Sequence, residues 1–266
     1  MSDDGRMHVP GPSDVEVTGG ATDGPDGQRP AHFPRRVTSF RARRSTISDR
    51  QQAIWDERWP ELGLQARTGD EPAAPLDTDA WFGRHAPLVL EIGCGTGTST
   101  LAMAQAEPDV DVIAVEVYRR GLAQLLAAID RTAATNPVGN IRLIRGDGVD
   151  VLTHMLTPGS LTGVRVYFPD PWPKARHHKR RLLQADTVAL IADRLRPGGI
   201  FHAATDHSGY AEQIAEVGDA EPRLRRITPS TTDPAGLPIS VARPVTKYER
   251  KALAGPDVTE LLWERS

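Results

Sequence analysis

The chain has 266 residues, with 32 Lys and Arg against 35 Asp and Glu and a formal net charge of −3. The length predicts one or two domains, and the charge excludes a uniformly basic protein, so an anionic partner would have to bind a local basic patch. The single cysteine, Cys94, excludes an internal disulfide framework and a Cys-rich zinc cluster. It is typical of a reducing compartment, so we expect a cytoplasmic protein. No run of about 18 apolar residues predicts a membrane span.

The first part of the chain has an unusual composition. Between Met1 and Pro30 there is no Leu, Ile, Phe, Trp or Tyr, and Gly, Pro and acidic residues dominate. Such a stretch cannot bury enough apolar surface to offset its ordering entropy. We therefore expect residues 1–32 to be a disordered acidic tail. It has no charged start followed by an apolar run, so it does not resemble a secretory signal.

A basic arm is predicted next, over residues 33–86 together with an N-terminal helical segment. Five arginines lie close to Phe33 and Phe40: Arg35, Arg36, Arg41, Arg43 and Arg44. Either Ser45 or Ser48 is placed to cap a helix over Asp49–Leu64, which carries apolar residues at helical spacing.

From Pro87 to the last residue, 266, short apolar runs alternate with helical stretches, which is typical of βαβ units and a mainly parallel sheet. We expect strands at Leu88–Ile92, Val112–Glu116, Ile141–Gly146, Val164–Phe168, Ile200–Thr205 and Leu224–Thr228. We expect helices at Ser99–Ala106, Arg119–Ala134, Gly148–Met155, Lys179–Leu195 and Tyr210–Val217. The Arg196-Pro-Gly-Gly199 segment is a strong helix stop.

A glycine-rich loop follows the first of these strands. Gly93, Gly95 and Gly97 alternate along it, and a helix is predicted immediately afterwards, so the backbone can turn tightly and approach a ligand closely. Glu116 ends the next strand about 20 residues later, where a carboxylate accepts both hydroxyls of a ribose. These features predict a nucleoside site, which NAD enzymes also have. Cys94 is interpreted as a small loop residue, because no base accompanies it.

Two further acids favour a cationic cofactor. Glu91 directly precedes the glycines and Asp147 follows the third strand; both would repel a pyrophosphate and attract S-adenosylmethionine. The pattern resembles class I S-adenosylmethionine-dependent methyltransferases, whose loop reads E-x-G-x-G-x-G and is followed by acids after the second and third strands. That resemblance implies that Glu91 lies near the methionine end of the cofactor, Glu116 binds the ribose and Asp147 binds the adenine amino group.

The fourth strand is followed by Pro169-Asp-Pro-Trp-Pro-Lys174, at the edge of the sheet where ligands of open α/β folds bind. The prolines restrict the backbone around Asp170 and Trp172, as positioning catalysis requires. The basic run Lys174–Arg181 comes next; it can bind phosphates, and Trp172 offers a face for a base. His177 and His178 lie among cations and lack a carboxylate or thiolate at ligand spacing, so no metal site is predicted.

With Thr205-Asp206 and Thr246-Lys-Tyr-Glu249, these motifs resemble the bacterial tRNA (guanine-N7-)-methyltransferase family over roughly residues 40–254. The resemblance implies an α/β fold with a Rossmann-like, seven-stranded, mostly parallel sheet and helices on both faces. It implies methyl transfer from S-adenosylmethionine to N7 of a variable-loop guanine (m7G46) in tRNA, without a partner subunit and as a monomer or weak homodimer. Carried over position by position, it makes Asp170 the active-site acid, which also lies at the cofactor. The substrate-binding positions are then Lys174, Asp206, Thr246, Lys247, Tyr248 and Glu249.

Guanine N7 has an exposed lone pair and no proton, so no general base is obligatory. Carboxylates would instead hold the N1 and N2 donors of guanine and favour the developing charge; Asp170, Asp206 and Glu249 are the candidates. The target base must leave its stacked position, while Arg41, Arg43, Arg44 and the Lys174–Arg181 run hold the tRNA backbone.

Three other functions fit the sequence less well. A small-molecule methyltransferase has no need of two basic clusters, and a non-catalytic RNA-binding subunit has no need of the cofactor acids. An NAD-dependent oxidoreductase is disfavoured by Glu91 and by the absence of a recognisable Tyr-x-x-x-Lys motif.

Overall fold

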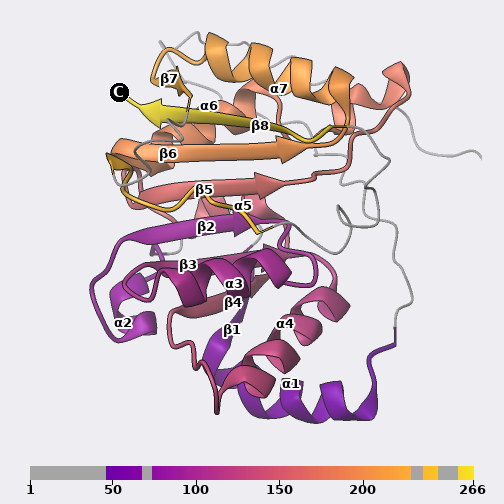
Figure 1. Ribbon diagram of the computed structural model, residues 1–266, viewed down its shortest axis with the longest axis vertical. Helices are drawn as coiled ribbons and strands as arrows, with labels where there is room; N and C mark the ends of the chain where they lie inside the picture. Colours follow the sequence, from indigo (N-terminus) through magenta and orange to yellow (C-terminus); the bar gives the residue numbers. More distant parts are fainter. Residues whose placement is uncertain (1–45, 68–73, 229–235, 245–256) are drawn as a thin grey trace, which may run out of the picture. The chain divides into compact units, whose positions relative to one another are not determined.

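The sheet is the centre of the molecule, and its eight strands lie in the order β1-β4-β3-β2-β5-β6-β8-β7 (Figure 1). The computed structural model describes residues 46–67, 74–228, 236–244 and 257–266. The predicted acidic tail and the five arginines of the basic arm therefore lie outside the described residues, and the division into tail, arm and main domain stays a prediction.

Most of the strands run parallel. Their bounds are β1 Gly63–Gln65, β2 Leu88–Ile92, β3 Asp111–Glu116, β4 Ile141–Arg145, β5 Leu161–Tyr167, β6 Leu195–Thr205, β7 Leu224–Ile227 and β8 Thr259–Arg265. Strands β1 to β6 pair with one another only in parallel, whereas β8 pairs antiparallel with both β6 and β7. The carboxyl ends of the parallel strands consequently meet at one edge, where open α/β sheets bind ligands.

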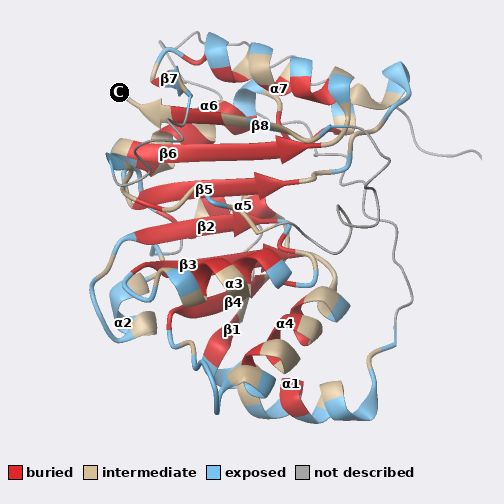
Figure 2. Cartoon of the chain, viewed as in Figure 1, coloured by how far each residue is buried: buried red, intermediate tan, exposed pale blue. Residues whose placement is uncertain are grey.

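Helices cover both faces, as predicted. They are α1 Asp49–Leu62, α2 Thr78–Phe82, α3 Thr98–Ala106, α4 Arg119–Thr132, α5 Gly148–His154, α6 Ala185–Arg194 and α7 Ser208–Ala220, with a 3-10 helix, η1, at Ala175–Arg180. Helices α1, α3 and α4 contribute to one buried apolar cluster, and α5, α6 and α7 to another. The central strands between them are buried along most of their length (Figure 2). No helix in the described ranges is long and apolar enough to span a membrane.

The N-terminal helix is capped by Ser48, the second of the two serines considered. The Ser48 Oγ accepts a hydrogen bond from the Gln51 backbone N–H (3.3 Å), and the Gln51 Oε1 accepts one from the Ser48 N–H (3.1 Å). This reciprocal pair is a capping box, which satisfies two otherwise unpaired donors.

All six predicted strands are present, but three expectations need correction. The sheet has eight strands rather than seven; the pattern missed β1, a three-residue edge strand paired with β4, and β8. The helix expected at Lys179–Leu195 begins only at Ala185. Before it, the Leu183 N–H donates to the Tyr210 hydroxyl (3.0 Å), which keeps this stretch out of the helix. Finally, Arg196-Pro-Gly-Gly199 does end a helix, but it also belongs to β6.

Candidate active site

Five predicted acids lie at the carboxyl ends of five adjacent parallel strands. Glu91 is the penultimate residue of β2 and Glu116 ends β3; the other three acids follow β4, β5 and β6, and they are Asp147, Asp170 and Asp206. The strands that carry them are neighbours in the sheet. The fold therefore brings the predicted acids to one edge.

The glycine-rich loop is held against β3 by Glu116. Gly93, Gly95 and Gly97 all have positive φ (76°, 57° and 71°), which favours glycine. The Glu116 Oε2 accepts from the Gly95 N–H (3.0 Å), and its Oε1 accepts from the Tyr118 N–H (2.9 Å). Burial raises the pKa of Glu116, the backbone hydrogen bonds from Tyr118 and Gly95 act against this rise, and the charge of Asp170 adds a smaller increase. Each carboxylate oxygen can accept a second hydrogen bond, which leaves capacity for hydroxyls of a ligand.

Replacing Gly97 by Ala should destabilise the protein by about 2 kcal/mol, through positive φ and overpacking. A Cβ at Gly97 would lie 2.5 Å from Leu125 Cδ1 on α4. Gly83 is a matched control, since it has a similar φ of 74° and no atom within 4 Å of an added Cβ; Gly83→Ala should cost about 1 kcal/mol. Chemical unfolding of both variants measures the difference, and equal losses would show that the Leu125 contact is unimportant.

Glu91 is the most buried of these acids, with 2% of its surface exposed. Burial raises its pKa to about 7, and its Oε2 has no hydrogen-bond partner among the described residues. A buried carboxylate with an unused oxygen, next to a glycine-rich loop, fits a cationic ligand group. Asp147 is half-buried and caps α5, where its Oδ1 accepts from the Val149 N–H (2.9 Å).

The turn that carries Asp170 is strained. Phe168 and Trp172 have φ values of 51° and 44°, which are uncommon for residues with side chains. Such strain persists only where the surroundings fix it, and it is frequent at active sites. Asp170 itself is exposed. The turn thus presents this carboxylate to solvent from a rigid backbone.

Arg181 fixes this turn from inside the protein. Its Nε donates to the Pro171 carbonyl (2.8 Å), and its Nη1 donates to the Gly209 carbonyl (3.1 Å) and the Gln213 Oε1 (2.6 Å). Its guanidinium also lies 4.8 Å from the centre of the Tyr210 ring. The prediction that the whole basic run contacts RNA is therefore wrong for Arg181, which is buried and occupied by α7 and the turn.

The rest of the basic run forms η1 and is accessible. Lys174, Arg176 and Lys179 are exposed. Arg180 lies over the Trp172 ring (5.3 Å to its centre), and His177 meets that ring edge-on at 5.8 Å. Asp206 is half-buried just before α7. Thr246, Lys247, Tyr248 and Glu249 lie outside the described residues.

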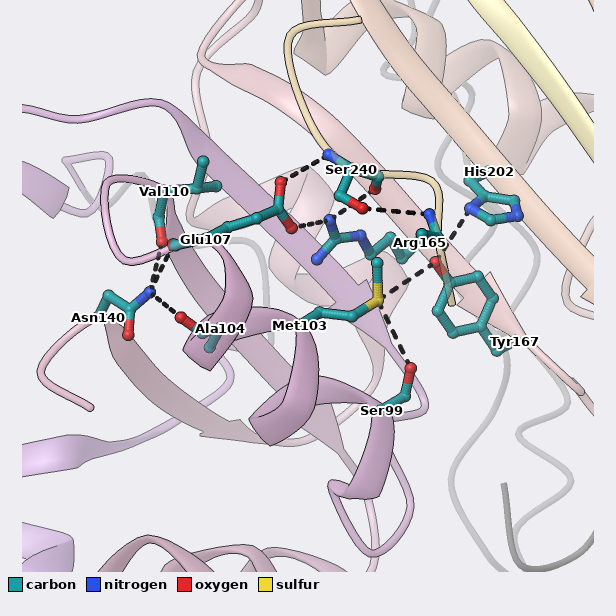
Figure 3. A network of polar contacts seen from close by, with 11 residues as sticks. Ser99, Met103, Ala104, Glu107, Val110, Asn140, Arg165, Tyr167, His202 and Ser240 are labelled. Atoms are coloured by element: carbon teal, nitrogen blue, oxygen red, sulfur yellow. Dashed lines mark hydrogen bonds and ion pairs between the residues drawn. The ribbon is translucent and has the colours of Figure 1, made fainter. Parts of the chain in front are cut away.

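A buried polar network behind this edge was not predicted. It links Arg165 and Tyr167 on β5 and His202 on β6 with Met103 on α3, Glu107 just after α3 and the backbone of Ser240 (Figure 3). Arg165 and His202 are completely buried in it. The His202 ring contacts the Tyr167 hydroxyl (3.0 Å) and the Glu260 Oε2 (2.9 Å), and burial lowers its pKa. The one signal in the sequence was a charged residue inside an apolar strand, at Arg165.

The open parallel sheet, the glycine-rich loop and the strand-end acids together define a Rossmann-like, nucleoside-binding α/β protein. A family described as "Putative methyltransferase" matches residues 85–259. A tRNA (guanine-N(7)-)-methyltransferase of Mycolicibacterium gilvum (strain PYR-GCK) is 77% identical, with 100% of both chains covered. The protein of the same name from Mycobacterium avium (strain 104) is 62% identical, again over 100% of both. The solved structure of the antibiotic-resistance methyltransferase Kmr aligns at 14% identity and a TM-score of 0.49, over 76% of this chain and 97% of Kmr. This chain belongs to the tRNA (guanine-N(7)-)-methyltransferase family.

Proposed function

We propose that this chain transfers the methyl group of S-adenosylmethionine to N7 of a variable-loop guanine in tRNA (m7G46). Full-length similarity to relatives named for that reaction supports the substrate. The observation that carries the cofactor is the buried Glu91 carboxylate, with its unpaired Oε2 beside the glycine-rich loop. We also propose a cytoplasmic enzyme that needs no partner subunit and is a monomer or weak homodimer.

The residues present fit S-adenosylmethionine. Glu91 would hold its cationic methionine end, and the backbone of Gly93, Gly95 and Gly97 would follow its length. Glu116 would accept the ribose hydroxyls, and Asp147 would accept from the adenine amino group. When bound, the cofactor supplies an electrophilic methyl group on a sulfonium. The acids, and Glu91 above all, would repel an anionic pyrophosphate at this loop.

Asp170 is the proposed catalytic residue. Guanine N7 attacks with a lone pair and loses no proton, so the protein needs to orient the base and favour the positive charge that develops on the ring. Asp170 would accept from the N1 and N2 donors of guanine. The strained backbone at Phe168 and Trp172 fixes its direction before the substrate arrives. Lys174, Asp206 and the segment Thr246–Glu249 would complete the pocket, with Asp170 also lying at the cofactor.

The tRNA backbone would lie along η1. Lys174, Arg176 and Lys179 are exposed there, beside the Trp172 and Arg180 pair. Phosphate contacts of this kind release counterions, so binding weakens as salt is raised. Arg41, Arg43 and Arg44 would extend the same contact, although they lie outside the described residues. The target guanine would have to leave its stacked position to reach the edge of the sheet.

The test is incubation of the purified chain with labelled S-adenosylmethionine and unmodified tRNA, followed by nucleoside analysis. We expect the label in 7-methylguanosine. A tRNA in which the variable-loop guanine is replaced by adenine is the matched control and should stay unlabelled. Label in another nucleoside would contradict the proposed target, and transfer to a small molecule in place of tRNA would support the alternative substrate class.

A further inference from the structure

Arg165 lies directly beside Glu91 in the sheet. The two residues are register partners on the parallel strands β5 and β2, so their side chains project from the same face. Arg165 is completely buried and Glu91 almost so. Arg165 is not among the residues assigned above to cofactor or substrate binding. Its position nevertheless places a positive charge next to Glu91, the carboxylate proposed to bind the cofactor.

The guanidinium is anchored at one end only. Its Nη2 donates to the Glu107 Oε2 (2.7 Å) and to the Ser240 carbonyl (3.0 Å), and the Ser240 N–H donates to the Glu107 Oε1 (2.5 Å) (Figure 3). Its Nε and Nη1 have no hydrogen-bond partner among the residues that the structure describes. The unpaired Oε2 of Glu91 is likewise buried. A buried cation and a buried carboxylate, each with unused polar atoms, therefore occupy neighbouring positions.

In this arrangement the positive charge of Arg165 stabilises the negative charge of the Glu91 carboxylate. Burial raises the pKa of Glu91 to about 7, and the positive charge of Arg165 acts against that rise, as the Thr100 side chain does to a smaller extent. The other titratable or charged side chains near this interior come from the surrounding elements: Cys94 in the loop, Glu107 after α3, Glu116 on β3, Tyr167 on β5, His202 on β6, Glu260 on β8 and Arg243 in the stretch 236–244. Among these groups, Glu107 forms an ion pair with Arg165.

We propose that Arg165 is a positioning residue that keeps Glu91 ionised and available to the cationic amino group of S-adenosylmethionine, without touching the cofactor itself. The inference rests on the proposed function of the site. Glu107 and Ser240 hold the guanidinium of Arg165 in place. The negative charge of Glu107 also offsets part of the positive charge that Arg165 exerts on Glu91. Removing the Arg165 guanidinium and removing the Glu107 carboxylate should therefore change the charge that acts on Glu91 in opposite directions.

The first experiment measures the affinity of Arg165→Met for S-adenosylmethionine against pH. A cationic ligand favours ionised Glu91, so affinity rises with pH and levels off above the pKa of the free protein, about 7 in the unaltered chain. Without Arg165 that midpoint should move to higher pH, and affinity at neutral pH should fall about fivefold for the first pH unit of movement and about tenfold for each further unit. Arg165→Lys should restore most of the affinity.

Two controls separate this role from a loss of structure. 5′-Methylthioadenosine has no amino acid portion, so its affinity should stay unchanged in Arg165→Met. Glu107→Gln removes a competing carboxylate and should move the midpoint to lower pH, opposite to Arg165→Met; it also serves if Arg165→Met does not fold. An unshifted midpoint in Arg165→Met, or a shift in the same direction in both variants, would overturn the inference. Failure of the unaltered chain to bind S-adenosylmethionine would instead overturn the proposed function.

Discussion

Asp170→Asn is expected to lower the rate of tRNA methylation by about 100- to 1,000-fold, the usual cost of losing one preorganised electrostatic group. Asn has nearly the same shape as Asp, so the substitution removes the charge that would favour a positive guanine ring. Single-turnover transfer from labelled S-adenosylmethionine measures the effect. Separate titration of the cofactor assigns the loss to the transfer step or to cofactor binding.

The strain in the turn makes this experiment selective. Phe168 and Trp172 keep their positive φ values whichever side chain is at position 170, because the prolines and Arg181 fix the backbone. Thermal unfolding of Asp170→Asn should therefore match that of the unaltered chain. Asp186→Asn, at an exposed position in the first turn of α6, is the matched control and should keep full activity. Undiminished turnover in Asp170→Asn would contradict the assignment and direct attention to Asp206.

Arg181→Met should lower the free energy of unfolding by about 3–5 kcal/mol and reduce methyl transfer. The substitution leaves the Pro171 carbonyl, the Gly209 carbonyl and the Gln213 amide oxygen without their donor, at about 1–3 kcal/mol each when buried. For a domain of this size the melting temperature should fall by about 10 °C. Differential scanning calorimetry and the methylation assay measure the two effects.

Arg176→Met is the control for Arg181→Met. Arg176 is exposed on the same basic run, so its loss should leave the melting temperature unchanged while weakening tRNA binding. Arg181→Lys should not restore stability, since an ammonium cannot reach three acceptors in the geometry of the guanidinium fork. If Arg181→Met kept its melting temperature and lost only tRNA affinity, Arg181 would act on the RNA and not on the turn.

The sequence was informative wherever local pattern decides structure. The strands β2 to β5 are short, mostly apolar runs, and the predicted bounds lie close to the observed ones. Strand β6 begins at Leu195 and not at the predicted Ile200, because its first residues are the Arg196-Pro-Gly-Gly199 segment that the sequence predicts only as a helix stop. β8 was missed because its adjacent Leu261 and Leu262 break the alternation of a half-buried strand, and its place depends on distant pairing with β6. The start of α6 was misjudged because a basic run resembles an exposed helix, whereas Arg181 turns inward.

In the candidate site, too, local pattern was informative and contacts between distant residues were not predictable. Glu91, Glu116, Asp147 and Asp170 were predictable because each lies at a strand end, and parallel strands bring such ends together. Arg165 was not, because its partners Glu107 and Ser240 are 58 and 75 residues away in the chain. No spacing in the sequence encodes a contact of that kind.

The position of β8 also affects how the protein is made. Although it comes last in sequence among the described strands, it lies between β6 and β7 and supplies the only partner that β7 has among them. Its Trp263 is completely buried, stacks on Phe201 at 5.2 Å and donates to the Asp219 Oδ1 (3.0 Å). Until the ribosome has released this strand, β6 has an open edge and Phe201 lacks its aromatic neighbour. The described sheet is therefore complete only after Thr259–Arg265 has been made, and a chain truncated before Thr259 exposes the edge of β6 and is prone to aggregate.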